Sequence, residues 1–251
     1  MASLWKIVDF CDEHLRTSEI ADSDNALNGL QIANSGKVTR IGAAVDASTR
    51  TMREAVSRQI DLLIVHHGLF WSGLRPITGP LYRQVRLAFD HDLALYSAHL
   101  PLDAHPKLGN NAQLAAAIGL AKARPFFEYK GTPIGMRVRG EGSTAELVSK
   151  LEQALDGPVK AFLFGPKKPK RIGIVTGAAG SEIHRAAAEG IDTFITGEAP
   201  HWAAVAAEEL EMNLLLGGHY ATETFGVKAL AEHLSRKFDV PWEFVSAPTG
   251  L

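Results

Sequence analysis

Short uninterrupted apolar runs alternate with amphipathic segments along this chain of 251 residues. The run LLIV at residues 62–65 is bounded by Asp61 and, after two histidines, by Gly68, which is typical of a strand covered on both faces of a sheet. Residues 4–15 instead repeat apolar side chains at helical spacing and predict an amphipathic helix. The alternation of these patterns predicts an α/β fold with parallel strands and right-handed crossovers.

One part of this pattern occurs twice. The segment KVTRIGAAVDASTRTMREAVSRQIDLLIVHHGLFW at residues 37–71 aligns without a gap with KPKRIGIVTGAAGSEIHRAAAEGIDTFITGEAPHW at residues 168–202. Arg40 aligns with Arg171, and every aligned pair is 131 residues apart. Chance similarity of two strand–helix–strand units is the alternative, but a gapless match of about thirty-five positions favours internal duplication.

The duplication defines the expected domain organisation. We predict two similar α/β/α halves, residues 1–126 and 127–251, with the helix of the repeated unit near residues 48–59 in the first and 181–189 in the second. Each half is long enough to bury its own core. Ligands in such folds bind at the carboxyl ends of the strands, so a functional site is expected at those ends.

Two adjacent histidines follow the first repeated strand. On a continuing strand His66 and His67 would point to opposite faces of the sheet, so the strand is expected to end before them if both serve one site. The alternative is one satisfied core histidine beside one exposed one. In the second copy His67 aligns with Glu198, which is expected to be a buried carboxylate with a partner.

A second coincidence lies after the next apolar run of each half. His99 with Asp103 and His219 with Glu223 share the spacing histidine-x-x-x-carboxylate and superpose at an offset of 120 residues. Pro101 predicts an irregular turn in the first half, and Glu223 is expected to open a helix. Either geometry can bring the two side chains of each pair together.

These residues supply imidazole and carboxylate ligands without a thiolate. Such ligands suit catalytic zinc, iron, manganese or cobalt, and Cys11, the only cysteine, cannot form a disulfide within the chain or a cysteine-built zinc site. Adjacent diverging histidines are more naturally shared between two ions than gathered on one. The sequence therefore favours two metals about 3.5–4 Å apart.

Composition limits the classes of partner. The chain is 46% apolar and 22% charged with a formal charge of −2, which gives nucleic acid or an anionic membrane no support. The basic stretch PKKPKR at residues 166–171 is interpreted as a solvated turn. The chain shows no signal peptide or membrane span and one cysteine, so we expect a soluble, cytoplasmic protein.

The motifs together resemble the Nif-three-like dinuclear-metal proteins, also labelled GTP cyclohydrolase type-two homologues. The resemblance covers nearly the whole chain. It rests on DNALNGLQ at 24–31, HHG at 66–68, AHLPLDAHPKLGNNAQLA at 98–115, TGE at 196–198 and GHYATE at 218–223.

The resemblance implies a metal site in the cleft between the halves, with His99 and Glu198 lining it. It also implies a ring-shaped homohexamer. Tyr220 stands where relatives often have a second histidine, and residues 127–165 are too short to hold the small extra domain that many relatives carry. The implied ligands of two divalent transition-metal ions are His66, His67, Asp103, His219 and Glu223.

The implied activity is metal-dependent hydrolysis of a small polar molecule, specifically the opening of the purine ring of GTP at C8. His99 or Glu198 would carry protons. The chain has no GxxxxGK[ST] loop, so a triphosphate would need helix amino termini and scattered basic residues. The alternatives are a phosphoester or amide hydrolase using the same two metals, and a non-catalytic metal-binding scaffold that serves protein partners.

Three weaker features have structural explanations. Asn110 and Asn111 are expected to cap the helix that follows them, and the polar segment 24–31 is ordinary turn chemistry apart from the family pattern. Trp71 and Trp202 are equivalent in the repeat and are expected to pack at the mouth of each half.

Overall fold

The computed structural model describes residues 1–71, 76–120 and 122–251. The chain divides into two compact units, which we call unit 1 (residues 1–102 and 226–247) and unit 2 (residues 103–225 and 248–251). The sequence predicted a single boundary after residue 126. The division differs because the C-terminal part of the chain returns to the sheet of unit 1, where a strand near the chain end pairs with the first repeated strand.

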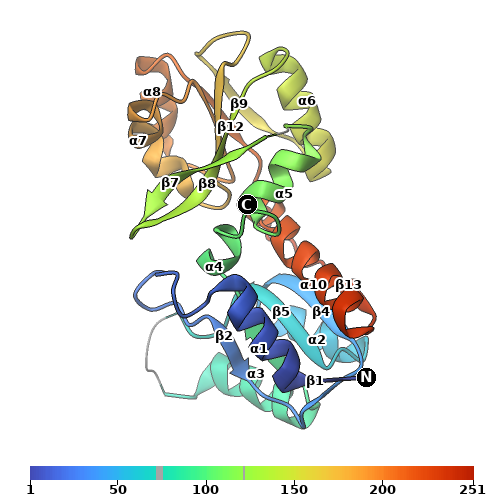
Figure 1. Ribbon diagram of the computed structural model, residues 1–251. Coiled ribbons are helices and arrows are strands. Elements are labelled where there is room, and N and C mark those ends of the chain that lie inside the picture. The colour runs from blue at the N-terminus through green and yellow to red at the C-terminus, as the bar shows by residue number, and fades with distance from the viewer. Residues whose placement is uncertain (72–75, 121) are drawn as a thin grey trace. The chain divides into compact units, whose positions relative to one another are not determined.

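Unit 1 is built on a five-stranded sheet of order β13-β4-β5-β6-β2 (Figure 1). The strands β13, β4, β5 and β6 are parallel, and β2 is antiparallel to β6. The strands are β2 (Gly29–Ile32), β4 (Ile41–Asp46), β5 (Leu62–His67), β6 (Ala94–Ser97) and β13 (Trp242–Phe244); β1 (Ala2–Ser3) and β3 (Lys37–Val38) form a separate pair.

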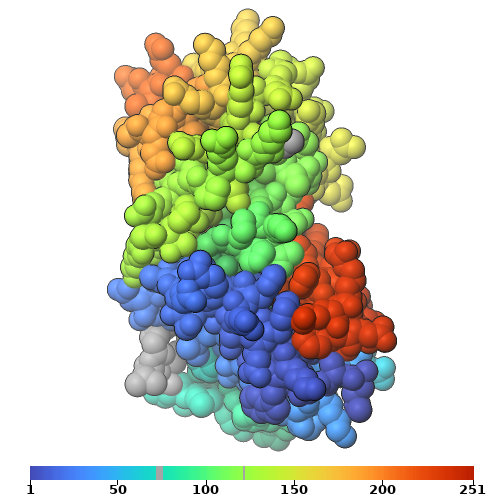
Figure 2. Space-filling model, in the orientation of Figure 1, coloured from blue at the N-terminus to red at the C-terminus, as the bar shows by residue number. Residues whose placement is uncertain are grey.

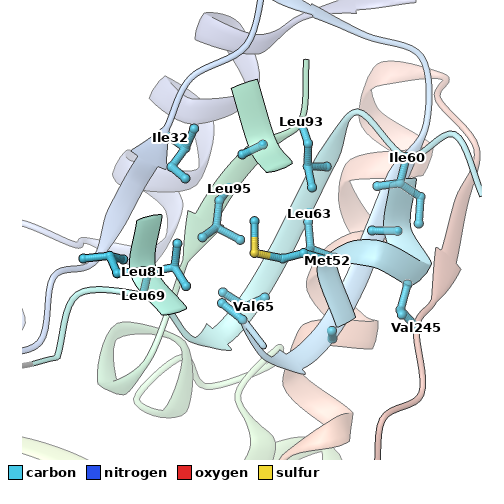
Figure 3. Close-up of a cluster of buried hydrophobic side chains, with 14 residues drawn as sticks. Ile32, Met52, Ile60, Leu63, Val65, Leu69, Leu81, Leu93, Leu95 and Val245 are labelled. Atoms are coloured by element: carbon cyan, nitrogen blue, oxygen red, sulfur yellow. The ribbon is translucent and has the colours of Figure 1, made fainter. Parts of the chain in front are cut away.

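Helices cover both faces of this sheet. The core on one face joins sheet residues such as Leu63 and Leu95 to Met52 of α2 and Leu81 of α3 (Figure 3). On the other face α1 lies against β6, where the hydroxyl of Tyr96 donates a 2.8 Å hydrogen bond to Asp12. The helices are α1 (Leu4–Leu15), α2 (Thr49–Ser57), α3 (Gly79–Asp90), the short α4 (Leu100–Asp103) and α10 (Thr224–Phe238).

Unit 2 contains a six-stranded sheet of order β7-β8-β10-β11-β12-β9. Its central strands β10, β11 and β12 are parallel, and the flanking strands run antiparallel to their neighbours. The strands are β7 (Arg124–Tyr129), β8 (Thr132–Arg139), β9 (Lys160–Leu163), β10 (Arg171–Ile174), β11 (Thr193–Thr196) and β12 (Asn213–Leu216).

Helices again lie on both faces. One core joins α5 and α6 to the sheet, and a second core joins α7 and α8 to its other face. Both units are therefore α/β/α sandwiches, which confirms the predicted fold of two similar α/β halves. The helices are α5 (Asn110–Ala117), α6 (Thr144–Leu155), α7 (Ile183–Ala188), α8 (His201–Glu209) and the short α9 (His219–Thr222), with a 3₁₀ turn, η1 (Ala179–Glu182), before α7.

The repeated unit has the predicted structure in both copies. In unit 1, β4 leads through α2 to β5, and Ser48 caps α2 by accepting a 3.0 Å hydrogen bond from the amide of Thr51. In unit 2, β10 leads through η1 and α7 to β11. The predicted helices at 48–59 and 181–189 are confirmed to within a few residues.

Three local predictions were wrong. β5 includes both His66 and His67, because His67 still pairs with Asp46 of β4 although pairing with β6 ends at Val65. Pro101 lies in the short helix α4, where the first helical turn needs no amide donor from it. Neither asparagine of the pair 110–111 caps α5, because that helix begins one residue earlier with Gly109 as its N-cap.

No helix in the part of the chain that the structure describes combines the length and the hydropathy needed to cross a bilayer.

Candidate metal centre

Unit 1 brings three predicted site residues together at the ends of β5 and β6. One ring nitrogen from each of His66, His67 and His99 lies within 4.8 Å of the others. The ring centroids are 4.9 Å apart for His66 and His67, 4.8 Å for His66 and His99, and 5.6 Å for His67 and His99. The two adjacent histidines thus share one site although both belong to the strand.

Each of these rings is held through Nδ1 by an oxygen atom. Nδ1 of His66 lies 2.8 Å from the carbonyl oxygen of Ala98. Nδ1 of His67 lies 2.8 Å from Oδ1 of Asp46, and Nδ1 of His99 lies 2.8 Å from Oδ1 of Asp22. A carbonyl and an ionised carboxylate only accept hydrogen bonds, so Nδ1 is the donor in each contact and Nε2 is the nitrogen on the other side of the ring, where a metal ion would bind. This is how metal-ligating histidines are oriented in proteins.

Asp22 is itself tightly held. Its side chain is 5% exposed, and its Oδ2 accepts hydrogen bonds from Nδ2 of Asn28 at 2.8 Å and from the amide of Leu100 at 3.1 Å. Burial raises the pKa of Asp22, but hydrogen bonds from His99, Asn28 and the amide of Ser23 outweigh it and lower the pKa to about 2. Asp22 therefore remains a carboxylate that fixes the ring of His99.

Sequence reasoning missed Asp22 and Asp46. Asp22 lies in an irregular polar segment with no periodicity. The sequence does contain a signal for Asp46. It is the last residue of the first repeated strand, β4, and parallel pairing of the two repeated strands places it beside His67 at the end of β5. Asn28 belongs to the segment whose pattern is that of ordinary turn chemistry, yet its Oδ1 accepts a 2.8 Å hydrogen bond from the amide of His99.

The two equivalent tryptophans have different surroundings. Trp71 packs edge-on against His99 with ring centroids 4.7 Å apart and lies 5.6 Å from His67. Trp202 is 46% exposed and stacks on His184 at 6.1 Å. Both tryptophans were expected to pack at the mouth of their half. Of the two, Trp71 does so and forms an apolar wall beside the imidazoles, whereas Trp202 is exposed.

Unit 2 places Glu198 and Glu223 around His219, at the start of α9. Its Nδ1 lies 2.9 Å from Oε1 of Glu198, and its Nε2 lies 3.1 Å from Oε2 of Glu223. The hydrogen bond with Glu223, helped by that with Glu198, outweighs burial and raises the pKa of His219 to about 9. Nε2 of His219 and the carboxylate of Glu223 are therefore candidate ligand atoms in unit 2.

A glycine makes room for this pair. Gly177 has φ +71°, and a Cβ at this position would collide with the carboxylate of Glu223 and lie 3.6 Å from Nε2 of His219. The amide of Gly177 donates to the hydroxyl of Thr222 at 3.2 Å. Gly177 occupies the repeat position of Asp46, 131 residues later, so one half uses this strand end to support a histidine and the other uses it to admit a carboxylate.

Asp103 and Glu198 have different surroundings. Asp103 is 7% exposed and accepts a 2.8 Å hydrogen bond from Nδ2 of Asn110, and the group of three imidazoles does not include it. The side chain of Glu198 is 43% exposed, so the prediction that it is buried was wrong. Its predicted partner exists but is His219, because Glu198 follows β11 directly and lies beside the beginning of α9.

The donor sets fit divalent transition metals. Unit 1 offers three imidazoles whose Nδ1 atoms are anchored. Unit 2 offers an imidazole and a buried carboxylate with a second carboxylate on the other side of the ring. Nitrogen and oxygen donors without thiolates suit zinc, iron, manganese and cobalt in catalytic sites. Both groups of residues could therefore hold a metal ion.

Comparison with known proteins agrees with this fold. A profile of the family Duf34/NIF3 (NGG1p interacting factor 3) matches residues 2–249. A Deinococcus radiodurans protein named GTP cyclohydrolase 1 type 2 homolog is 42% identical, covering 98% of this chain and 94% of its own. A Pyrococcus abyssi protein of the same name is 39% identical over 98% of each chain.

Solved structures show the same architecture. The crystal structure of TTHA1606 from Thermus thermophilus superposes with a TM-score of 0.92 at 35% identity and covers 100% of both chains. Reduced HcgD from Methanocaldococcus jannaschii superposes with a TM-score of 0.86 at 26% identity over 98% of each chain. The chain, with its repeated α/β halves and its groups of histidines and carboxylates, belongs to the Duf34/NIF3 family.

Proposed function

We propose that the protein is a dinuclear-metal-dependent hydrolase that opens the ring of a nucleotide, as a GTP cyclohydrolase does. The observation that carries this proposal is the orientation of His66, His67 and His99, each of which is anchored through Nδ1 by an oxygen atom, as metal-ligating histidines are. In unit 2, His219 lies between the carboxylates of Glu198 and Glu223. Three imidazoles oriented in this way, with one nitrogen of each within 4.8 Å of the others, favour a site built for metal. The names of the relatives point to the same chemistry.

Two divalent ions, zinc, iron, manganese or cobalt, are proposed as cofactors. The number of ligand candidates supports two ions, because a single tetrahedral ion is satisfied by four protein or water ligands. The proposed ligands are His66, His67, Asp103, His219 and Glu223.

When bound, such ions make water a nucleophile near neutral pH and polarise the electrophile. The residues of this chain would position the substrate and move protons. For GTP, water adds to C8, the imidazole ring opens to a formamide, and a second water releases formate. His99, held by Asp22, and Glu198, half exposed beside His219, are the proposed proton carriers.

The assembly is proposed to be a homohexamer, which rests on the family resemblance. The partner of the site is proposed to be a small molecule, because the chemistry offered is that of hydrolysis and not of macromolecular recognition.

Formate release tests the function. Metal-reconstituted protein incubated with GTP as sole substrate should release formate, and protein changed at His66 to alanine should release none. Hydrolysis of phosphoesters or amides without formate release would identify a different hydrolase with the same metals. A metal-loaded protein that turns over no member of such a panel, and that loses its assembly but not its fold when metal is removed, would be a scaffold.

A further inference from the structure

Basic side chains gather at one end of the sheet of unit 2. They line a hollow of about 680 Å³ together with the carboxylates of Glu141 and Glu189. The residues of β7 and β8, yellow-green in Figure 2, lie at the molecular surface on the face shown. The cations of this basic hollow are Lys122, Arg124, Arg137, Arg139, Lys170 and Arg171.

The strand register places arginines directly opposite one another on neighbouring strands. Arg124 of β7 is the direct partner of Arg137 of β8, and Arg139 of β8 is the direct partner of Arg171 of β10. Like charges directly opposite one another destabilise a sheet. Two such pairs on three neighbouring strands are not what folding alone would favour. They would, however, attract and bind an anionic ligand.

All four guanidinium groups belong to one face of the sheet. Arg137 and Arg139 are two residues apart on β8 and point the same way, whereas Val138 between them is buried against the core of α5 and α6. Their cross-strand partners share that face. The four charges therefore converge on one hollow and are not spread around the unit.

The two carboxylates that line the hollow offset only part of the charge of its six cations. None of the ion pairs in the described ranges involves any of the six cations, and Glu189 lies 3.7 Å from Arg185 on its own helix face. Arg171 is positioned over Gly190, where a Cβ would meet its Nη1 at 3.0 Å. The hollow thus carries an excess of positive charge that a bound anion would offset.

The basic hollow is distinct from the histidine group of the same unit. Arg171 is the first residue of β10, whereas Gly177, which touches Glu223 and His219, follows the carboxyl end of that strand. A four-residue strand spans roughly 13 Å. The two features therefore lie at opposite ends of the sheet, and the hollow does not depend on the proposed hydrolysis.

We propose that this basic hollow binds a small ligand with several linked phosphate groups, such as an inorganic or nucleoside polyphosphate. Guanidinium groups bind phosphate oxygens in pairs of parallel hydrogen bonds, and four of them match a ligand with more than one phosphate. The volume lies in the range typical of small-molecule sites. A nucleic acid would instead need a basic track along the surface, and the net charge of −2 does not favour one.

Calorimetric titration of the metal-loaded protein with inorganic triphosphate tests the site. The double variant R124Q/R137Q should bind triphosphate at least tenfold more weakly than the parent while its metal content stays unchanged. Without ligand its melting temperature should equal or exceed that of the parent, because a repulsive pair is gone. The control R53Q/R83Q removes two exposed arginines of unit 1 and the same net charge, and it should bind like the parent.

Three results would overturn the assignment. Full triphosphate affinity in R124Q/R137Q would place binding elsewhere, with the metal centre as the first alternative. An equal loss in R53Q/R83Q would reduce the effect to overall charge. Tighter binding of a single-stranded oligonucleotide than of triphosphate, lost in the same variant, would make the hollow a nucleic-acid surface instead.

Discussion

Asp46 and His67 are joined twice: they are direct partners in the β4–β5 ladder, and Nδ1 of His67 donates a 2.8 Å hydrogen bond to Oδ1 of Asp46. The backbone pairing fixes where the carboxylate lies, and the carboxylate fixes which ring nitrogen donates to it. The orientation of the proposed ligand therefore follows from strand register, one of the most strongly specified features of a sheet with buried faces.

Changing Asp46 to asparagine should weaken metal binding by about 10- to 100-fold, because the amide retains an acceptor but loses the charge that raises the basicity of the ring. Competition with a chromogenic chelator measures this affinity. The control D9N changes an exposed aspartate of α1 and should bind metal like the parent. Equal affinity in D46N and the parent would make the hydrogen bond irrelevant to metal.

Gly177 makes a second test possible, on unit 2. The change G177A should displace the carboxylate of Glu223 and lower metal affinity, because a Cβ there would occupy the space of that carboxylate. Left-handed backbone strain adds about 1 kcal/mol of destabilisation on its own.

The variant G119A separates these two effects. Gly119 has φ +75°, and a Cβ at this position would meet nothing within 4 Å, so G119A should show the strain in a urea unfolding curve and keep the metal affinity of the parent. If both variants bind metal equally well, Gly177 does not shape the site.

Glu198 offers a test of mechanism. The change E198Q keeps the size of the side chain and an acceptor for Nδ1 of His219, but it cannot carry a proton. Metal content should stay at the parent value while turnover falls by about 10² or more. Unchanged turnover with full metal occupancy would leave Glu198 a positioning residue and transfer the proton-carrying role to His99.

Assembly is tested separately. Light scattering at micromolar concentration should give a mass close to six chains. A monomer that persists across a wide concentration range would remove the proposed ring and leave the metal chemistry to each chain alone.

The layered fold was predictable because strongly buried strands and amphipathic helices leave a periodic pattern that the duplication shows twice. The domain division was not, because the return of β13 to β4 is a contact between residues about 200 positions apart in sequence, which no local pattern encodes. The same reason explains why the sequence missed Asp22, which contacts His99 across 77 residues.

The histidines themselves were predictable, since each follows or ends an apolar run at the carboxyl edge of a sheet. Their environments were not. The exposure of Glu198 and the bond between Asp103 and Asn110 depend on how loops fold over strand ends, and a short polar loop has several satisfactory arrangements.

Metal stoichiometry tests the central claim most directly. Elemental analysis of freshly purified protein that has not been exposed to a chelator should give close to two transition-metal ions per chain. The variants H66A and E223A should hold less metal with an unchanged far-UV circular dichroism spectrum, and H91A, which changes an exposed histidine, should hold as much as the parent. A firm value of one ion per chain after reconstitution, or none, would contradict the dinuclear centre.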